Sequence, residues 1–208
     1  MTPILYLHGF ASSPASSKAR FFAAQLRAAG AQVQIPDLSD GDFEHLTITA
    51  QLAVMERAAG AGPVSLVGSS MGGYLAALYA ARHPEVQRLV LLAPAFRFAY
   101  NFAKTIGPEA VAAWKLAPSE VFHYGDGRTR LLSYQLLEDG QAYEDFPDFS
   151  QPALIFHGRH DDVVPAAYSE EFAASHPNAH LEVLDSGHDL LNMLDYMAPR
   201  VCDFLTAP

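Results

Sequence analysis

The stretch Val64-Ser65-Leu66-Val67-Gly68-Ser69-Ser70-Met71-Gly72-Gly73 decides the fold of this 208-residue chain. Its first four residues are mostly apolar and predict a buried strand, whereas the apolar segment 71–82 predicts a helix. The pattern Gly-x-Ser-x-Gly between them is typical of a sharp, strained turn that exposes the serine hydroxyl at the edge of a sheet. Glycines stand on either side because larger side chains would collide there. The free N–H groups at the start of the helix favour negative charge near Ser70, so the sequence predicts a nucleophilic serine.

Short apolar segments alternate with amphipathic segments along most of the chain. The strands are predicted at 4–7, 33–35, 64–67, 89–92, 153–156 and 181–184. The helices are predicted from Ser16 or Ser17 to Ala29, from Thr47 to Gly60, and over 71–82, 166–175 and 190–205. Continuous apolar strands separated by helices are typical of a parallel sheet that is covered on both faces. We therefore predict an α/β fold, with a mostly parallel six-stranded sheet in one domain spanning 1–208.

Residues 95–150 interrupt this alternation, because they run for more than 50 residues without a clear strand. A segment this long inside a compact domain needs its own structure or its own function. We predict a helical, cap-like insertion above the carboxyl edge of the sheet, with two or three of its rings facing the site and the others forming a small core of their own. Its aromatic residues are Phe96, Phe98, Tyr100, Phe102, Trp114, Phe122, Tyr124 and Tyr134.

A serine hydroxyl is a weak nucleophile until a base takes its proton. Two later segments that follow predicted strands supply a base and an acid, namely 157–165 and 186–189. Because the carboxyl ends of parallel strands meet at one edge, we expect both segments to lie beside Ser70. His188 is the predicted base, and the acid that orients its ring is Asp161 or its neighbour Asp162.

A site of this kind also needs N–H donors that stabilise an oxyanion. We predict the backbone N–H of Met71, which follows the serine, and that of Phe10, in the loop after the first strand. His8 and His157 also follow strands, but no third ligand at metal spacing accompanies them in the sequence. We therefore expect these two histidines to pack or to hydrogen-bond loop backbone, and we predict neither a metal nor a cofactor.

The composition limits the partners of this chain. Its formal net charge is −10, which disfavours nucleic acid and anionic membrane surfaces as partners. The sequence has no apolar stretch long enough to span a bilayer and no signal-peptide pattern, and its single cysteine suits a reducing compartment. We expect a cytoplasmic protein that acts on a small molecule, as a monomer or a homodimer.

Together, residues 6–10, the Gly68–Gly72 motif, residues 157–165 and Gly187-His188 resemble the α/β-hydrolase superfamily over the whole chain except the insertion. The segment Leu7-His8-Gly9-Phe10-Ala11-Ser12-Ser13-Pro14-Ala15-Ser16-Ser17-Lys18 is similar to that of the small bacterial YqiA-type esterases. This resemblance implies a catalytic triad of Ser70, Asp161 and His188, and favours Asp161 over Asp162. It also implies a sheet without the first two strands of the larger enzymes, and simple carboxylic esters as substrates.

The expected function is therefore that of a serine esterase. The aromatic insertion and the lack of clustered Arg or Lys favour small, uncharged, partly apolar esters, although the insertion matches no motif that identifies a substrate. The same triad serves thioesterases, amidases or peptidases and carbon–carbon hydrolases, and a non-catalytic ligand-binding relative is a further alternative. Asp162 is expected to cap the turn or the helix after Pro165.

Overall fold

The structure, a computed structural model, describes residues 2–207, and its centre is a six-stranded sheet in which every neighbouring pair is parallel. The strand order is β2-β1-β3-β4-β7-β8. The strands are β1 (Ile4–Leu7), β2 (Val33–Gln34), β3 (Val64–Ser69), β4 (Val86–Leu92), β7 (Ala153–Gly158) and β8 (Ala179–Leu184). The predicted fold class and all six predicted strands are confirmed.

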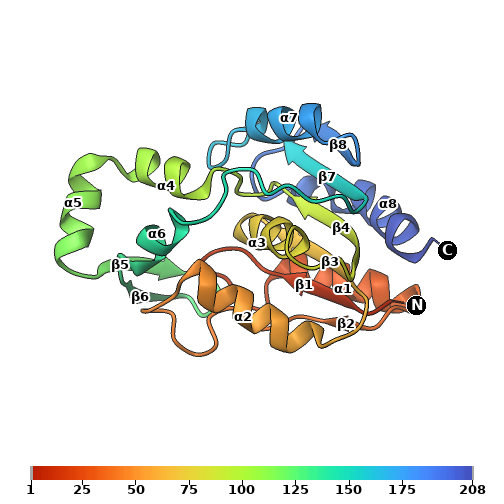
Figure 1. Ribbon diagram of the computed structural model, residues 1–208, viewed down its shortest axis with the longest axis horizontal. Coiled ribbons are helices and arrows are strands. Elements are labelled where there is room, and N and C mark those ends of the chain that lie inside the picture. The colour runs from red at the N-terminus through yellow and green to blue at the C-terminus, as the bar shows by residue number, and fades with distance from the viewer. Residues whose placement is uncertain (1, 208) are drawn as a thin grey trace.

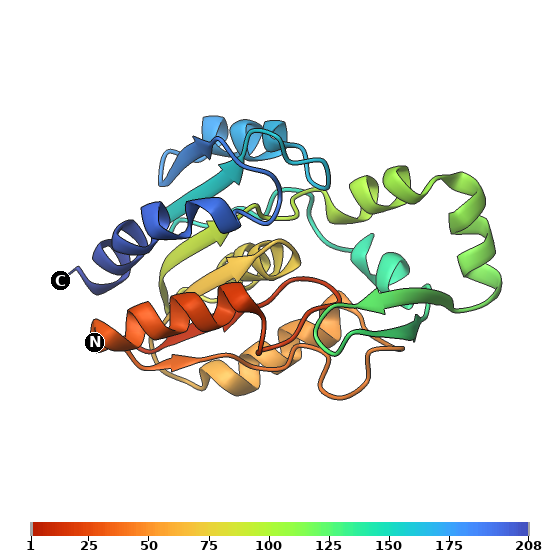
Figure 2. The same ribbon diagram turned by 180° about the vertical axis from the view of Figure 1, so that it is seen from behind.

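Helices cover both faces of this sheet (Figures 1 and 2). One layer contains α1 and α8, and the opposite layer contains α2, α3 and α7. The strands serve both layers because their side chains alternate: in β1, Ile4 and Tyr6 pack towards α1 and α8, whereas Leu5 and Leu7 pack towards α2 and α3. The helices are α1 (Ser17–Ala28), α2 (Ile48–Ala59), α3 (Met71–Ala80), α7 (Ala166–Ser175) and α8 (Leu194–Thr206), with a 3₁₀ turn at Leu191–Met193.

Two helix starts are fixed by the side chains that the sequence suggested. The Ser16 hydroxyl accepts a hydrogen bond from the backbone N–H of Ala19, and the Thr47 hydroxyl accepts one from the N–H of Ala50. Each satisfies one of the N–H groups that a helix leaves free at its first turn. The caps therefore set where α1 and α2 begin relative to the sheet.

The segment 95–150 extends beyond the carboxyl ends of the strands (Figures 1 and 2). It contains three helices, α4 (Phe98–Ile106), α5 (Pro108–Leu116) and α6 (Gln135–Gly140). It is not helical throughout, because β5 (Ser119–His123) and β6 (Arg128–Leu132) form an antiparallel hairpin that the sequence analysis did not predict.

The insertion has the small core of its own that was expected. The ring of Trp114 lies 5.6 Å from that of Phe102 and 5.6 Å from that of Tyr134, measured between centroids. The Trp114 indole N–H donates to the Leu132 carbonyl at 2.6 Å, which ties α5 to the hairpin. The turn of the hairpin contacts the loop after β1, since the Tyr124 N–H donates to the carbonyl of Ala11 at 2.7 Å.

In the part of the chain from 2 to 207, no helix combines the length and the apolar character that crossing a bilayer requires.

Candidate active site

Ser70 occupies the turn between β3 and α3 in a backbone conformation that L residues rarely adopt, with φ 53° and ψ −116°. Its N–H donates to the Leu92 carbonyl at 2.8 Å, and its carbonyl accepts from the N–H of Ala95 at 3.0 Å. These bonds to the end of β4 hold the strained turn in place. The two glycines are required by space: a Cβ at Gly68 would overlap the Gly72 carbonyl oxygen, and one at Gly72 would overlap that of Leu7.

Ser70, His188 and Asp161 form a continuous chain of hydrogen bonds. The Ser70 Oγ lies 3.0 Å from Nε2 of His188, and Nδ1 of the same ring lies 2.7 Å from Oδ2 of Asp161. The Asp161 side chain is fully buried, whereas that of His188 is 22% exposed. An ionised carboxylate accepts only, so Nδ1 of His188 carries the proton and Nε2 is left free to accept from the serine hydroxyl.

Asp161 is held as a carboxylate by four donors. Its Oδ1 accepts from the N–H groups of Val163 and Val164 at 2.9 and 2.8 Å, and its Oδ2 lies 3.1 Å from Nε2 of His157 as well as next to His188. Burial alone would raise the pKa of Asp161, but the hydrogen bonds from His157, His188 and Val164, and the charge of His188, outweigh it. The net result is a pKa well below the usual range of aspartate.

His157 was expected to pack or to hydrogen-bond loop backbone, and it does contact the backbone of Val164, but it also belongs to the site through Asp161. Its ring is fully buried, and its Nδ1 lies 2.8 Å from the Ser169 hydroxyl. Its Nε2 lies 2.9 Å from the Val164 carbonyl in addition to the 3.1 Å contact with Asp161. Both neighbours of Nε2 are acceptors, so Nε2 carries the proton and the Ser169 hydroxyl donates to Nδ1. The spacing of four residues between His157 and Asp161, directly after a strand, was the signal in the sequence.

Asp162 does not have the role that the sequence suggested. The turn before α7 is capped by the Asp161 carboxylate, as its bonds to Val163 and Val164 show, and α7 begins after Pro165 without a side-chain cap. Asp162 is exposed and lines a hollow beside Ser70. The side chains of two adjacent residues in a tight turn point in different directions. Here the side chain of Asp161 points towards His188, and that of Asp162 does not.

The two residues expected to supply oxyanion donors line the same hollow as Ser70. Met71 is the first residue of α3, so its N–H has no acceptor within the helix. The peptide between Gly9 and Phe10 is oriented by His8, whose Nδ1 lies 3.0 Å from the Gly9 carbonyl while its Nε2 accepts from the Leu38 N–H at 3.3 Å. A planar trans peptide directs its N–H opposite to its carbonyl, so His8 fixes the direction of the Phe10 N–H. Burial lowers the pKa of His8, which keeps this ring neutral.

Two hollows meet at Ser70. The smaller one has a volume of about 160 Å³, and its walls are mainly apolar and include four phenylalanines. The larger one has a volume of about 750 Å³ and contains His188 together with most of the polar side chains near the site. Residues of the smaller hollow include Phe10, Met71, Phe96, Phe98, Phe102, Ile106 and Val164. Residues of the larger one include Tyr6, Ser12, Ser17, Lys18, Tyr124, Asp162 and Asp189.

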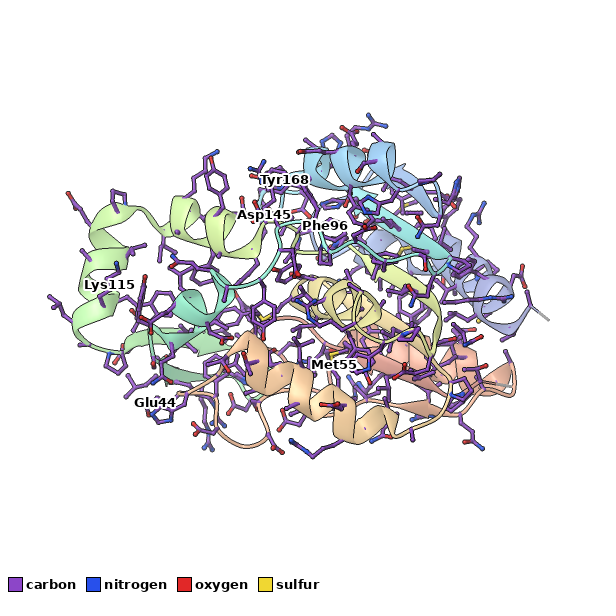
Figure 3. All side chains as sticks on the ribbon, viewed as in Figure 1. Glu44, Met55, Phe96, Lys115, Asp145 and Tyr168 are labelled. Atoms are coloured by element: carbon purple, nitrogen blue, oxygen red, sulfur yellow. The ribbon has the colours of Figure 1, made fainter. Side chains whose placement is uncertain are left out.

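The insertion contributes rings to both hollows. Phe96, Phe98 and Phe102 line the smaller one, and Tyr124 lines the larger one. Phe96 is held between α3 and α7 (Figure 3), where its ring stacks on Phe172 at 4.4 Å between centroids. Four rings of 95–150 therefore line the hollows at Ser70, where two or three were predicted. Trp114 and Tyr134 belong to the small core described above, whereas Tyr100 and Phe122 are exposed.

Among residues 2–207, no cluster of three or more His, Cys, Asp or Glu side chains has the arrangement that a metal ion requires.

The parallel sheet and the serine turn after β3 define the α/β-hydrolase fold. Alpha/beta hydrolase domain-containing protein 10 from mouse shares it at a TM-score of 0.81 and 18% identity, over 98% of this chain and 89% of the mouse chain. Est1E from Butyrivibrio proteoclasticus with bound ferulic acid shares it at 0.80 and 23%, over 99% and 88% of the two chains. An esterase from Pyrococcus furiosus does so at 0.63 and 19%, over 98% and 80%. The chain belongs to the uncharacterised protein family UPF0227, whose family model matches residues 3–206.

Proposed function

We propose that this chain is a serine hydrolase that cleaves carboxylic esters, with Ser70 as nucleophile, His188 as base and Asp161 as the acid that orients His188. The observation that supports this most directly is the unbroken series of hydrogen bonds from Asp161 through His188 to Ser70, at 2.7 and 3.0 Å. An esterase from Pyrococcus furiosus and a ferulic acid-binding protein are among the chains of similar fold, which agrees with the proposal.

The reaction follows from the proton positions. His188 Nε2 takes the proton of Ser70 as Oγ bonds to the ester carbonyl carbon, and the resulting imidazolium is stabilised by the Asp161 carboxylate. The N–H groups of Met71 and Phe10 stabilise the oxyanion. Loss of one such donor raises the activation free energy by about 3 kcal/mol. The carbon–oxygen bond to the alcohol then breaks, and His188 returns the proton to the departing alcohol. Water, deprotonated by His188, releases the acid from Ser70 in the same way.

The test combines turnover with labelling of the serine. We expect a fluorophosphonate probe to label Ser70 and the protein to hydrolyse a short p-nitrophenyl ester, and Ser70→Ala to lose both properties while keeping its circular dichroism spectrum. Ser65→Ala is the matched control, because Ser65 is a buried serine on β3, the strand that leads to Ser70, and lines neither hollow at the site. Full turnover by folded Ser70→Ala would overturn the proposal, and so would a wild-type protein that no probe labels.

A further inference from the structure

The two hollows beside Ser70 differ in whether His188 lines them, and this difference indicates which hollow holds the acyl group of an ester and which holds the alcohol. His188 lines only the larger hollow, whereas Met71 lines only the smaller one. In the proposed reaction the departing alcohol receives its proton from His188, so the alcohol leaves on the side where that ring lies. The acyl group therefore occupies the smaller hollow and the alcohol occupies the larger one. This inference rests on the proposed function.

The smaller hollow restricts the acyl group to a short chain. Its volume of about 160 Å³ corresponds to about five water volumes, which is below the range of sites that bind drug-sized ligands. Phe96, Phe98 and Phe102 line it, and no charged residue between 2 and 207 does. An apolar acyl chain of a few carbons fits these walls.

The larger hollow offers both donors and acceptors. The hydroxyl of Ser17 and the ammonium of Lys18 lie on one side of it, and the carboxylates of Asp162 and Asp189 also line it. Tyr6 lines the same hollow, and its buried hydroxyl has no hydrogen-bond partner within residues 2–207. A ligand with several polar groups would satisfy atoms that the protein leaves without partners.

Lys18 is the least expected of these residues. It lies in the first turn of α1 and is partly buried, yet its ammonium forms no hydrogen bond or ion pair with any residue from 2 to 207. The nearby charges that act on it are the carboxylates of Asp189 and Asp161. Burial lowers the pKa of Lys18 to about 8, although these two carboxylates oppose the shift. Holding a charged group in this position destabilises the fold, which points to a role in binding.

The charges of the hollow select among polar alcohols. An anionic alcohol would face Asp162 and Asp189 in a protein whose net charge is −10, and a cationic one would face Lys18. Hydroxyl groups can donate to the carboxylates and accept from the ammonium at the same time. We propose that the substrates are esters of a short apolar acid with a neutral, polyhydroxylated alcohol, and that Lys18 is a specificity-determining residue for that alcohol.

The first experiment measures kcat/KM of the wild-type protein for four butyrate esters that differ only in their alcohol. The alcohols are ethanol, glycerol, the anion glycolate and the cation choline. We expect kcat/KM for the glycerol ester to exceed those of the other three by about tenfold, which is the discrimination that one or two hydrogen bonds supply. Equal values for ethanol and glycerol would overturn the proposal, and so would a preference for either charged alcohol.

The second experiment tests Lys18 with a matched substitution. Lys18→Met is expected to lower the ratio of kcat/KM for the glycerol ester over the ethyl ester by about tenfold. Lys115→Met is the control, because Lys115 is exposed on α5, at the far end of the insertion (Figure 3). An unchanged ratio in folded Lys18→Met overturns the role of Lys18, and the wild-type comparison decides the substrate class if this variant does not fold. Absence of any ester hydrolysis contradicts the proposed function itself, whereas hydrolysis without preference for the polyol contradicts only this inference.

Discussion

The buried carboxylate of Asp161 depends on donors from three directions. The N–H groups of Val163 and Val164 bind one oxygen, and the rings of His188 and His157 share the other. Removing His157 would leave that second oxygen to His188 alone and free it to move. Because this carboxylate binds Nδ1 of His188, a change at His157 reaches Ser70 through three hydrogen bonds, namely those of His157 with Asp161, of Asp161 with His188 and of His188 with Ser70. We therefore treat His157 as a positioning residue.

We predict that His157→Leu lowers kcat for a p-nitrophenyl ester by about tenfold with little change in KM, since misplacement affects the reacting geometry more than substrate binding. His157→Gln should recover much of kcat, because its side-chain amide can donate towards Asp161 from nearly the position of Nε2. Both variants lose part of the bond network with Ser169 and Val164, which costs about 1–3 kcal/mol of unfolding free energy. Steady-state kinetics and chemical denaturation measure the two effects separately.

A purely structural role of His157 would give a different pattern. In that case kcat of folded protein would stay near the wild-type value in both variants, while their unfolding free energies fell. Equal kcat losses for His157→Leu and His157→Gln would also contradict the positioning role, because the restored donor would then have no effect.

At the scale of single residues, the sequence predicted those site residues that stand in a motif or directly after a strand. Ser70 was predicted from the Gly-x-Ser-x-Gly motif, and His188 from its position after a glycine that follows a strand. The two side chains are in contact. Choosing Asp161 over Asp162 required the family resemblance, since adjacent aspartates are equivalent until the turn conformation is known. Lys18 was not expected near the serine at all, because it approaches from the start of α1 and no local pattern encodes that approach.

At the scale of elements, the serine turn depends on close contact between α3 and β1. We predict that Gly72→Ala destabilises the protein by about 1–3 kcal/mol or prevents folding, because its new Cβ would overlap the Leu7 carbonyl and backbone cannot give way cheaply. Gly62→Ala is the control, since nothing lies within 4 Å of a Cβ built there. Urea denaturation of both variants is the measurement, and equal midpoints would contradict this account of the turn.

Helix α4 forms a wall of the small hollow. We predict that Phe102→Ala moves the preferred acyl chain of p-nitrophenyl esters to a longer length, because Phe102 lies between Phe10, Phe98 and Trp114 and its removal enlarges the hollow. Tyr100→Ala is the matched control on the same helix, since Tyr100 is 51% exposed and lies outside this hollow. A chain-length profile that is identical in Phe102→Ala and the wild type would show that α4 does not limit the acyl group.

The elements of the sheet were predictable and those of the insertion were less so, for a physical reason. Strands buried on both faces are continuous apolar runs, as in β3 and β7. The hairpin of β5 and β6 is mostly exposed and contains charged residues, so it lacks both the apolar run and a clear alternation. Its turn signal is Gly125-Asp126-Gly127, where Gly127 adopts a positive φ of 69°.

At the scale of the whole molecule, one parallel sheet brings the site together. Parallel strands deliver the loops after β1, β3, β7 and β8 to the same edge, so residues as far apart as Phe10 and His188 meet there. General rules of connection limit the order of the strands to a few alternatives, whereas the shape of the two hollows depends on how the insertion folds back over that edge. The fold was therefore predictable from the sequence pattern, whereas the shape of the two hollows was not.

The unfolding free energy of the whole molecule should report the cost of Lys18. The pKa of this lysine is about 8 in the folded protein and 10.5 as an unperturbed side chain, because burial opposes its charge. Between these values the unfolded chain binds more protons than the folded one, so the wild type gains stability as pH rises from 8 to 10.5, and loses that gain as pH falls from 10.5 to 8. Lys18→Met lacks this gain.

We predict that the unfolding free energy of Lys18→Met at pH 7 exceeds that of the wild type by on the order of 1 to 3 kcal/mol, since the lysine side chain is partly screened by solvent. Urea denaturation at several pH values should show this advantage shrinking above pH 8, and an advantage that is constant up to pH 10 would mean that Lys18 is not destabilised by burial.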